Sequence, residues 1–317
     1  MTANILVTGG NGFIGSHLVR QLMAAGHQVT VLSRSAVGYG NGRLAMLTAD
    51  FADVAAYADL LPRFDAIYHL AVTTNPGNSN DRILFDARTN LMGSLALIEA
   101  AARAKVSRFV FVSSGGSVYG PNGGAPIAED HPTAPISAHG VMKLTIEKYL
   151  HVFWQQYGMP YRVARVANPY GEGQHPDRGQ GLIAYVLGRL ARQEEIVVWG
   201  DGSVVRDYLY VGDVVDALLR MRVDNGRYQT YNVGSGEGLS VNEVIAALEA
   251  RLGLTAIVRY VAGRPADVPY SCLDVRRIDQ ELGWTPQTTL ADGISRTWRW
   301  IQHSYLPQVL TKAAHAA

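Results

Sequence analysis

Cysteine and charged side chains are scarce in this chain. Its 317 residues include one cysteine, Cys272, and 17% of them are charged, against about 25% in an average soluble domain. A single cysteine excludes an intrachain disulfide and a cysteine-based zinc cluster, so we expect no metal site and a reducing, cytoplasmic location. The 48% share of hydrophobic residues excludes a disordered chain, and the length predicts one large domain or two.

An excess of one charge and long apolar runs are also missing. Lys and Arg number 28 against 27 Asp and Glu, without a basic run that could follow a phosphate backbone, so nucleic acid is not an expected partner. Apolar stretches such as residues 109–112 fall far short of the roughly 20 residues that cross a bilayer. We expect a soluble protein without membrane association, and the early run into glycines argues against a signal peptide.

Short β-branched runs alternate with amphipathic stretches through the first half of the chain. This pattern predicts an α/β fold of the doubly wound, Rossmann type, in which a parallel sheet carries helices on both faces. The predicted strands are 5–8, 28–33, 45–48, 66–70, 108–113 and 162–165, and the predicted helices are 16–25, 84–104 and 139–157.

The sequence changes character after residue 167, where Gly- and Pro-punctuated loops replace the alternating pattern. We expect a dinucleotide-binding domain at 1–167, with returning segments near 204–234. A smaller, mainly C-terminal lobe for substrate is expected at 168–203 and 235–305, followed by a tail at 306–317.

Glycines follow the first predicted strand at a G-x-x-G-x-x-G spacing. Gly9, Gly12 and Gly15 lie in the segment TGGNGFIG, which leads into the first predicted helix. Glycine permits a tight turn and a close backbone approach to a pyrophosphate, and amides from Phe13 and Ile14 onward can donate to its charge. The segment predicts a dinucleotide site.

The residues after the second predicted strand bear on the choice of cofactor. An acid at this place binds the 2′-hydroxyl of NAD, whereas an arginine accommodates the 2′-phosphate of NADP. This chain has Ser33 and Arg34 there instead of an acid. Arg34 could equally be an ordinary exposed residue at a strand end, so these residues leave the choice open.

Further motifs accompany the glycine loop. In the first half these are Asp50-Phe51, His69-Leu70-Ala71, N-x-x-G at 90–93, SSGGSVYG at 113–120, and Lys143 followed by EKY at 147–149. In the second half they are NPYG at 168–171, RDY at 206–208, YNVG at 231–234 and R-P-x-D at 264–267. With them, nearly the whole chain resembles the extended short-chain dehydrogenase/reductase family, in its nucleotide-sugar epimerase and dehydratase group typified by UDP-glucose 4-epimerase.

The resemblance implies NAD as cofactor, with NADP possible because of Arg34, and a nucleotide-sugar as substrate. Beside the glycine loop, Ser33 and Arg34, it implies cofactor contacts from Asp50, Phe51, Leu70, Ala71, Asn90, Ser113 and Lys143. It implies substrate contacts from Ser117, Asn168, Arg206, Arg264 and Asp267. Arginine suits a diphosphate because its fork binds two oxygens, although Arg206 alone could also pair with a nearby acid.

The pattern departs from the family at the catalytic helix. The family's tyrosine base stands four residues before the catalytic lysine, and that position is His139 here, before Lys143. The usual serine position is Gly115, but Ser117 stands two residues on and would share its face in a strand. A neutral histidine could accept a hydroxyl proton at pH 7, so the open question is reach, because imidazole is shorter than phenol.

Three interpretations of His139 remain open. His139, or a water that it holds, acts as the base together with Lys143 and Ser117. Alternatively, the acid and base come from elsewhere, for example Ser117, Tyr119, Glu129 or Tyr170. In the third, the chain is a catalytically impaired sugar-nucleotide-binding protein or an engineered Tyr-to-His variant.

The residues also rank the possible reactions. Dehydratases of this group carry an Asp-Glu pair in the serine segment, where this chain has Gly116 and Ser117, so elimination of water lacks its acid and base. The expected reaction is epimerisation at C4 of a UDP-hexose through a transient 4-keto sugar. An NADPH-dependent 4-ketosugar reductase is the alternative that Arg34 favours. The resemblance further implies a homodimer through helices 84–104 and 139–157.

Overall fold

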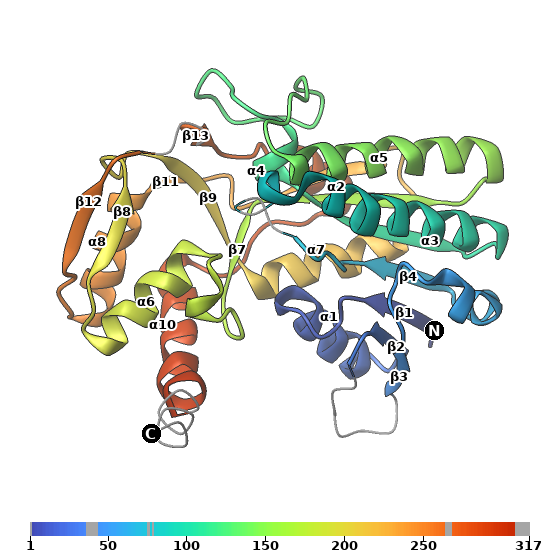
Figure 1. The fold of residues 1–317 in the computed structure, drawn as a ribbon, viewed down its shortest axis with the longest axis horizontal. Helices are drawn as coiled ribbons and strands as arrows, with labels where there is room; N and C mark the ends of the chain where they lie inside the picture. The colour runs from blue at the N-terminus through green and yellow to red at the C-terminus, as the bar shows by residue number, and fades with distance from the viewer. Residues whose placement is uncertain (1, 36–43, 75–76, 78, 264–267, 308–317) are drawn as a thin grey trace.

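The computed structural model describes residues 2–35, 44–74, 77, 79–263 and 268–307 and has two parts (Figure 1). A seven-stranded sheet, entirely parallel, forms the first part, in the order β10-β6-β5-β4-β1-β2-β3. Its strands are β1 (Asn4–Thr8), β2 (Gln28–Ser33), β3 (Leu44–Thr48), β4 (Ala66–His69), β5 (Arg108–Ser114), β6 (Tyr161–Val166) and β10 (Thr230–Val233).

Helices cover both faces of this sheet. The alternation along β1 explains why: Ile5 and Val7 join the core under α1 (Phe13–Ala24) and α7 (Val211–Val223), whereas Leu6 joins the core on the opposite face. That second face is covered by α3 (Met92–Arg103) and α5 (Ala138–Tyr157), which lie side by side in Figure 1. The doubly wound fold expected from the sequence is confirmed.

The predicted elements match the observed ones closely. All six predicted strands are present, with ends that differ by one residue at most. The predicted helix 84–104 is interrupted: α2 (Ile83–Asp86) is followed by a π-turn at Ala87–Leu91 before α3 begins. Local periodicity does not reveal this turn, because it depends on contacts that Asp86 and Asn90 make with a distant loop.

The second part contains the remaining strands and helices. Its sheet has the order β11-β9-β13 with β7 beside β9, and β8 pairs separately with β12. The strands are β7 (Asn168–Tyr170), β8 (Ile196–Trp199), β9 (Val205–Tyr210), β11 (Gly238–Ser240), β12 (Val258–Val261) and β13 (Tyr270–Ser271). The helices are α6 (Leu182–Arg192), α8 (Val241–Leu252) and α10 (Leu290–Trp300), while α9 (Arg276–Leu282) contacts β10.

The chain returns to the first sheet late in the sequence. Within the segment 204–234, β10 adds a strand to that sheet and α7 packs against β5 and β6. Strand β9 of the same segment lies in the second part. Of the expected tail at 306–317, residues 308–317 lie outside the described residues. Among the helices that the structure describes, each is too short or too polar to cross a membrane.

Candidate active site

A cavity of about 980 Å³ opens at the carboxyl ends of the parallel strands. Its walls include residues that follow β1, β2, β4, β5 and β6, and the second part closes the opposite side. Open α/β sheets place their ligands at this edge. The fold therefore brings residues from both halves of the sequence to one site.

The glycine loop forms one wall of this cavity. Gly9 has φ +71°, and a Cβ on Gly15 would lie 2.1 Å from the Gly9 carbonyl oxygen, so neither position accepts a side chain. Helix α1 begins at Phe13 with Gly12 as its N-cap, without a side-chain cap or an acid in its first turn. Its first amides thus keep their donors for an anion. Gly9, Gly12, Phe13, Ile14 and Gly15 all line the cavity, so the loop fits the diphosphate of a dinucleotide.

Further along, the predicted adenosine contacts divide into two groups. Ser33, Arg34 and Phe51 line the cavity, and Arg34 is exposed. Asp50 is not among the lining residues, and its Oδ1 accepts a hydrogen bond from the amide of Ala52 at 3.0 Å. Asp50 therefore shapes the turn that contains Phe51 and is not among the residues that line the cavity.

Beside the end of β4, Leu70 and Ala71, which the sequence assigns to the cofactor, line the cavity, but Asn90 does not. Asn90 is buried, and its Oδ1 accepts from the Thr73 amide at 2.9 Å and from Thr73 Oγ1 at 3.0 Å. Its Nδ2 donates to Asp86 Oδ1 at 2.9 Å across the π-turn. Asn90 thus holds the lining residue Thr73 in place, so it positions the wall.

His139 and Lys143 lie one turn apart near the start of α5, and both line the cavity. Side chains from a distant loop secure this turn: Ser79 Oγ accepts from the His139 amide at 3.1 Å, and Asn80 Oδ1 accepts from the Ala138 amide at 2.8 Å. His139 Nδ1 is buried and has no hydrogen-bond partner in the part of the chain that the structure describes. A buried ring nitrogen without a partner is uncommon in a folded protein.

Burial controls the charge of both side chains. Lys143 Nζ donates to the Val112 carbonyl at 2.8 Å and lies 4.7 Å from the centre of the Phe111 ring. Burial lowers the pKa of Lys143 to about 8, although the nearby carboxylates of Glu147 and Asp86 oppose this shift. For His139, burial and then the charge of Lys143 lower the pKa to about 3. His139 is neutral at pH 7, as expected, but it is also a much weaker base than the sequence suggested.

Ser113 and Ser117 lie on different elements. Ser113 ends the buried part of β5, and its Oγ donates to Glu147 Oε1 at 2.5 Å. Ser117 belongs to α4 (Gly115–Val118), a single helical turn, so the expected strand face shared with Gly115 is wrong. Ser114 Oγ donates to Ser117 Oγ at 3.1 Å, and all three serines line the cavity.

Gly115 has no room for the serine that the family commonly carries there. A Cβ at this position would lie 2.5 Å from Leu273 Cδ1, and Leu273 is itself buried. Ser117 offers a hydroxyl to the cavity from the helical turn α4, beside those of Ser113 and Ser114 at the end of β5.

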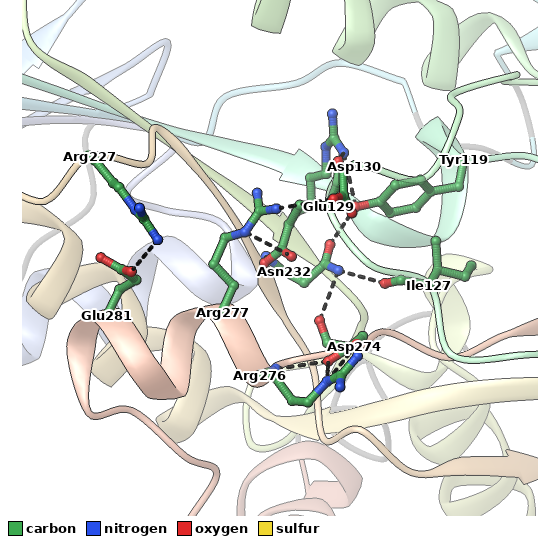
Figure 2. A network of polar contacts seen from close by, with 11 residues as sticks. Tyr119, Ile127, Glu129, Asp130, Arg227, Asn232, Asp274, Arg276, Arg277 and Glu281 are labelled. Carbon is green, nitrogen blue, oxygen red and sulfur yellow. Dashed lines mark hydrogen bonds and ion pairs between the residues drawn. The ribbon is translucent and has the colours of Figure 1, made fainter.

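The other candidates for acid and base do not line the cavity. Figure 2 shows the network that holds two of them. Tyr119 OH donates to the side-chain oxygen Oδ1 of Asn232 at 2.6 Å, and Glu129 Oε1 accepts from the backbone amide of Asn232 at 2.9 Å. Arg277 completes it with an ion pair to Glu129 at 3.3 Å. Tyr170 is buried in the core of the second part. Tyr119 and Glu129 are thus bonded to Asn232 of β10, and Tyr170 is packed in a core, so the hypothesis that one of them is the acid or base is not supported.

The predicted substrate residues are only partly described. Asn168 and Arg206 line the cavity: Asn168 Nδ2 donates to the Asp207 carbonyl at 3.0 Å, and Arg206 donates to the Val268 carbonyl at 2.7 Å. Asp207 of the same motif is not among the lining residues, and its carboxylate accepts a hydrogen bond from the backbone amide of Ser235 at 2.7 Å. Arg264 and Asp267 lie outside the described residues.

Asn11, Gln174 and Arg178 are among the polar lining residues that sequence reasoning missed. Buried oxygens of Asn11 and Gln174 lack a partner among the described residues. Both residues are in segments that the motifs already marked, at the glycine loop and after NPYG. Their side-chain direction, which decides their role, is not visible in a sequence.

Comparisons with known proteins agree with this geometry. A family model described as the NAD dependent epimerase/dehydratase family matches residues 5–234. UDP-glucose 4-epimerase of Mycolicibacterium smegmatis is 37% identical over 302 residues, which are 92% of this chain and 96% of that protein.

Solved structures extend the likeness to the whole fold. UDP-glucose 4-epimerase of Thermotoga maritima with UDP-glucose has a TM-score of 0.90 at 35% identity, over 95% of this chain and 99% of that one. UDP-glucose 4-epimerase of Thermus thermophilus in complex with NAD has a TM-score of 0.87 at 32% identity, with the same coverage. The chain belongs to the NAD-dependent epimerase/dehydratase family.

Proposed function

We propose that this chain is an NAD-dependent nucleotide-sugar epimerase that acts at C4 of a UDP-hexose. The observation that carries the proposal is the shared cavity: the glycine loop, Ser117, His139 and Lys143 all line one space of about 980 Å³. That volume is at the upper end of ligand pockets, about 300–1,000 Å³, as two bound molecules require. The relatives named above, all UDP-glucose 4-epimerases, support the same reaction.

The cofactor and the protein divide the work. NAD, when bound, supplies the hydride chemistry that oxidises C4 and then reduces the 4-keto sugar from its other face. The glycine loop and the amides of α1 hold its diphosphate. Lys143 places a positive charge beside the reacting centre, and Ser117 hydrogen-bonds the C4 oxygen.

His139 has the role of proton acceptor in this proposal. His139 lines the ligand-sized cavity, so a neutral ring nitrogen turned toward that space could accept a hydrogen bond from the C4 hydroxyl or from a water that bridges to it. Because its pKa is only about 3, it would take the proton only as the hydride leaves and the oxygen becomes acidic.

The substrate diphosphate is assigned to the other side of the cavity. Arg206 and Asn168 line that side and carry groups that bind phosphate oxygens. Arg264 and Asp267 are proposed for the same ligand from their motif. The division into a dinucleotide-binding domain and a smaller substrate lobe is proposed with it.

Product analysis with cofactor accounting tests the reaction. Purified protein should interconvert UDP-hexoses at C4, as followed by NMR, with no net change in NADH absorbance at 340 nm. A 4-ketosugar reductase would instead oxidise NADPH in proportion to product, and a binding protein would shift the melting temperature without turnover. Unchanged spectra with UDP-, dTDP- and GDP-sugars would contradict the proposal.

The pH dependence of kcat/KM follows from the two buried bases. Lys143 is charged below its pKa of about 8 and loses that charge as the pH rises, so kcat/KM should fall above about pH 8. His139 stays neutral above its pKa of about 3, so no acid limb is expected between about pH 5 and 7. Initial rates from pH 5 to 10 give the profile. An acid limb centred near 6.5 would show that His139 titrates as an ordinary histidine.

We also propose a homodimer and a cytoplasmic location. Large apolar side chains are exposed along the paired helices α2, α3 and α5: Leu84 is 73% exposed, Met92 60% and Val152 51%. Such a patch marks a protein interface more often than a free surface. Sedimentation velocity should give twice the chain mass, and Val152→Asp should give the monomer; a monomeric parent would contradict it. The single buried cysteine supports a reducing compartment, which cell fractionation tests.

A further inference from the structure

Glu147 is a buried side chain that lies on α5 one helical turn after Lys143. Its Oε1 accepts a hydrogen bond from Ser113 Oγ at 2.5 Å. Arg165 of β6 donates to both oxygens: its Nη2 lies 2.6 Å from Oε2, and its Nε lies 3.2 Å from Oε1 and 3.1 Å from Oε2. Because donors occupy both oxygens, neither has room for a proton, and Glu147 is a negatively charged carboxylate.

This carboxylate lies behind the cavity wall and not in it. Val112 and Ser113 are successive residues of β5, and both contact α5: the Val112 carbonyl accepts from Lys143 Nζ at 2.8 Å, and Ser113 donates to Glu147. Lys143, Val112 and Ser113 line the cavity, whereas Glu147 and Arg165 are not among the lining residues. Glu147 therefore acts on a ligand through the lining residues beside it.

Arg165 holds the carboxylate in place. The side chains of Arg165 and Glu147 are only 6% and 5% exposed. On its other side, Arg165 Nη1 donates to Tyr119 OH at 2.9 Å and to the Glu129 carbonyl at 3.1 Å, so the guanidinium is fixed as well. Across the ranges that the structure describes, Glu147 forms no direct ion pair with Lys143. Lys143 is thus near a negative charge that does not bind its ammonium group.

Few other charges surround Lys143. The groups that face it are Glu147 and His139 of α5, Asp86 of α2 and His69 of β4, with Arg165 of β6 paired to Glu147. Burial and the charge of Lys143 lower the pKa of both histidines to about 3, so these are neutral at pH 7. The charged residues of the π-turn and of α3 are open to solvent, Arg108 is at the opposite end of β5, and α4 has none.

The cavity side of Lys143 adds no negative charge, because there is no Asp or Glu among the described residues that line the cavity. Two carboxylates therefore oppose the effect of burial on Lys143, and that of Glu147 has the larger influence on its pKa.

We propose that Glu147 is a positioning residue for the reaction, which keeps Lys143 positively charged beside the reacting centre from behind the cavity wall. Its carboxylate offsets part of the cost of burying an ammonium charge. Because Arg165 holds the carboxylate, it does not draw Lys143 away from the cavity into a direct ion pair. The inference rests on the proposed function only for the part that Lys143 plays in the reaction.

Carbon-13 NMR of the lysine Cε atoms measures the charge of Lys143 without turnover. The chain has four lysines, which are Lys105, Lys143, Lys148 and Lys312, so a labelled full-length protein gives four signals, and Lys143→Met identifies that of Lys143. In the parent the midpoint of this signal should lie at about pH 8. A parent without epimerase activity would contradict the proposed function, whereas this titration still decides the role of Glu147.

Glu147→Gln keeps the shape of the side chain and removes its charge. The Lys143 midpoint should fall by about one pH unit, because a nearby opposite charge favours the charged form. The alkaline limb of kcat/KM should move with it, so kcat/KM should fall about eightfold at pH 8.5 and less than about twofold at pH 6. Glu147→Asp retains the charge and should bring both values back toward those of the parent.

Asp224→Asn is the matched control. Asp224 pairs with Arg162 of β6 at 2.5 Å, both side chains are 5% exposed, and neither residue is among those that line the cavity. This variant should lose stability as Glu147→Gln does, but its Lys143 midpoint should equal that of the parent. A Glu147→Gln protein whose midpoint also equals that of the parent overturns the inference, whatever its melting temperature.

A double variant covers the case in which Glu147→Gln does not fold. Glu147→Gln/Arg165→Met removes both charges, and a buried ion pair is replaced as a whole at far lower cost than one partner alone. The Lys143 midpoint should still fall, because Glu147 has the largest charge effect on the pKa of Lys143. An unchanged or higher midpoint overturns the inference.

Discussion

Lys143→Met is expected to lower kcat by about 10³-fold, the largest effect of any single substitution in this site. Methionine fills a similar volume but removes the charge beside the reacting oxygen. Lys143 is buried, and its Nζ is held by the Val112 carbonyl near the carboxylates of Glu147 and Asp86. Single-turnover reduction of bound NAD by a UDP-hexose measures the chemical step directly.

The same substitution separates catalysis from stability. Burial of the Lys143 charge is costly, so an apolar replacement should leave the melting temperature unchanged or raise it. Lys105→Met serves as the control, because Lys105 does not line the cavity. A Lys143→Met enzyme within threefold of the parent in kcat, and correctly folded, would remove Lys143 from the mechanism.

His139→Ala is expected to lower kcat by about 10²-fold, a smaller loss because His139 is a weak base. A water can occupy the space of the missing ring and relay the proton, which limits the effect. Steady-state epimerisation of a UDP-hexose at pH 7.5 measures it, with His303→Ala as the control, since His303 is exposed on the far C-terminal segment. If His139→Ala is as fast as the parent, His139 is a bystander and the proton goes elsewhere.

His139→Tyr gives the complementary result. The cavity lies directly against His139, so a phenol can extend into it and reach further than an imidazole. Lys143 would then lower the pKa of the new phenol, which otherwise titrates near 10. We expect activity equal to or above that of the parent together with a new acid limb in the pH profile. Loss of activity as large as in His139→Ala would mean that the pocket is shaped around histidine.

The parts of the site that the sequence predicted share a physical property: their roles follow from local spacing. Gly9, Gly12 and Gly15 are required by a turn that closes within eight residues, and His139 and Lys143 share a face because a helix repeats every 3.6 residues. The fold was predictable for the same reason, since a buried parallel strand is recognisable from its own few residues.

The parts that failed depend on contacts between distant segments. Ser117 lies in a helical turn, and a Cβ at Gly115 in the same turn would meet Leu273, which comes from the far end of the chain. Tyr119 and Glu129 face Asn232 instead of the cavity because β10 joins the sheet late. No periodicity in the first half of the chain carries this information.

The π-turn at Ala87–Leu91 marks the place where this helical stretch can change its length by one residue. It accommodates one more residue per turn than an α-helix does, and each residue of an α-helix advances the chain by about 100°. A sequence shorter by one residue there could run as an unbroken α-helix while the residues on either side keep nearly the same faces. A one-residue deletion within α3 itself has no such compensation and would turn one part of the helix by about 100° relative to the other.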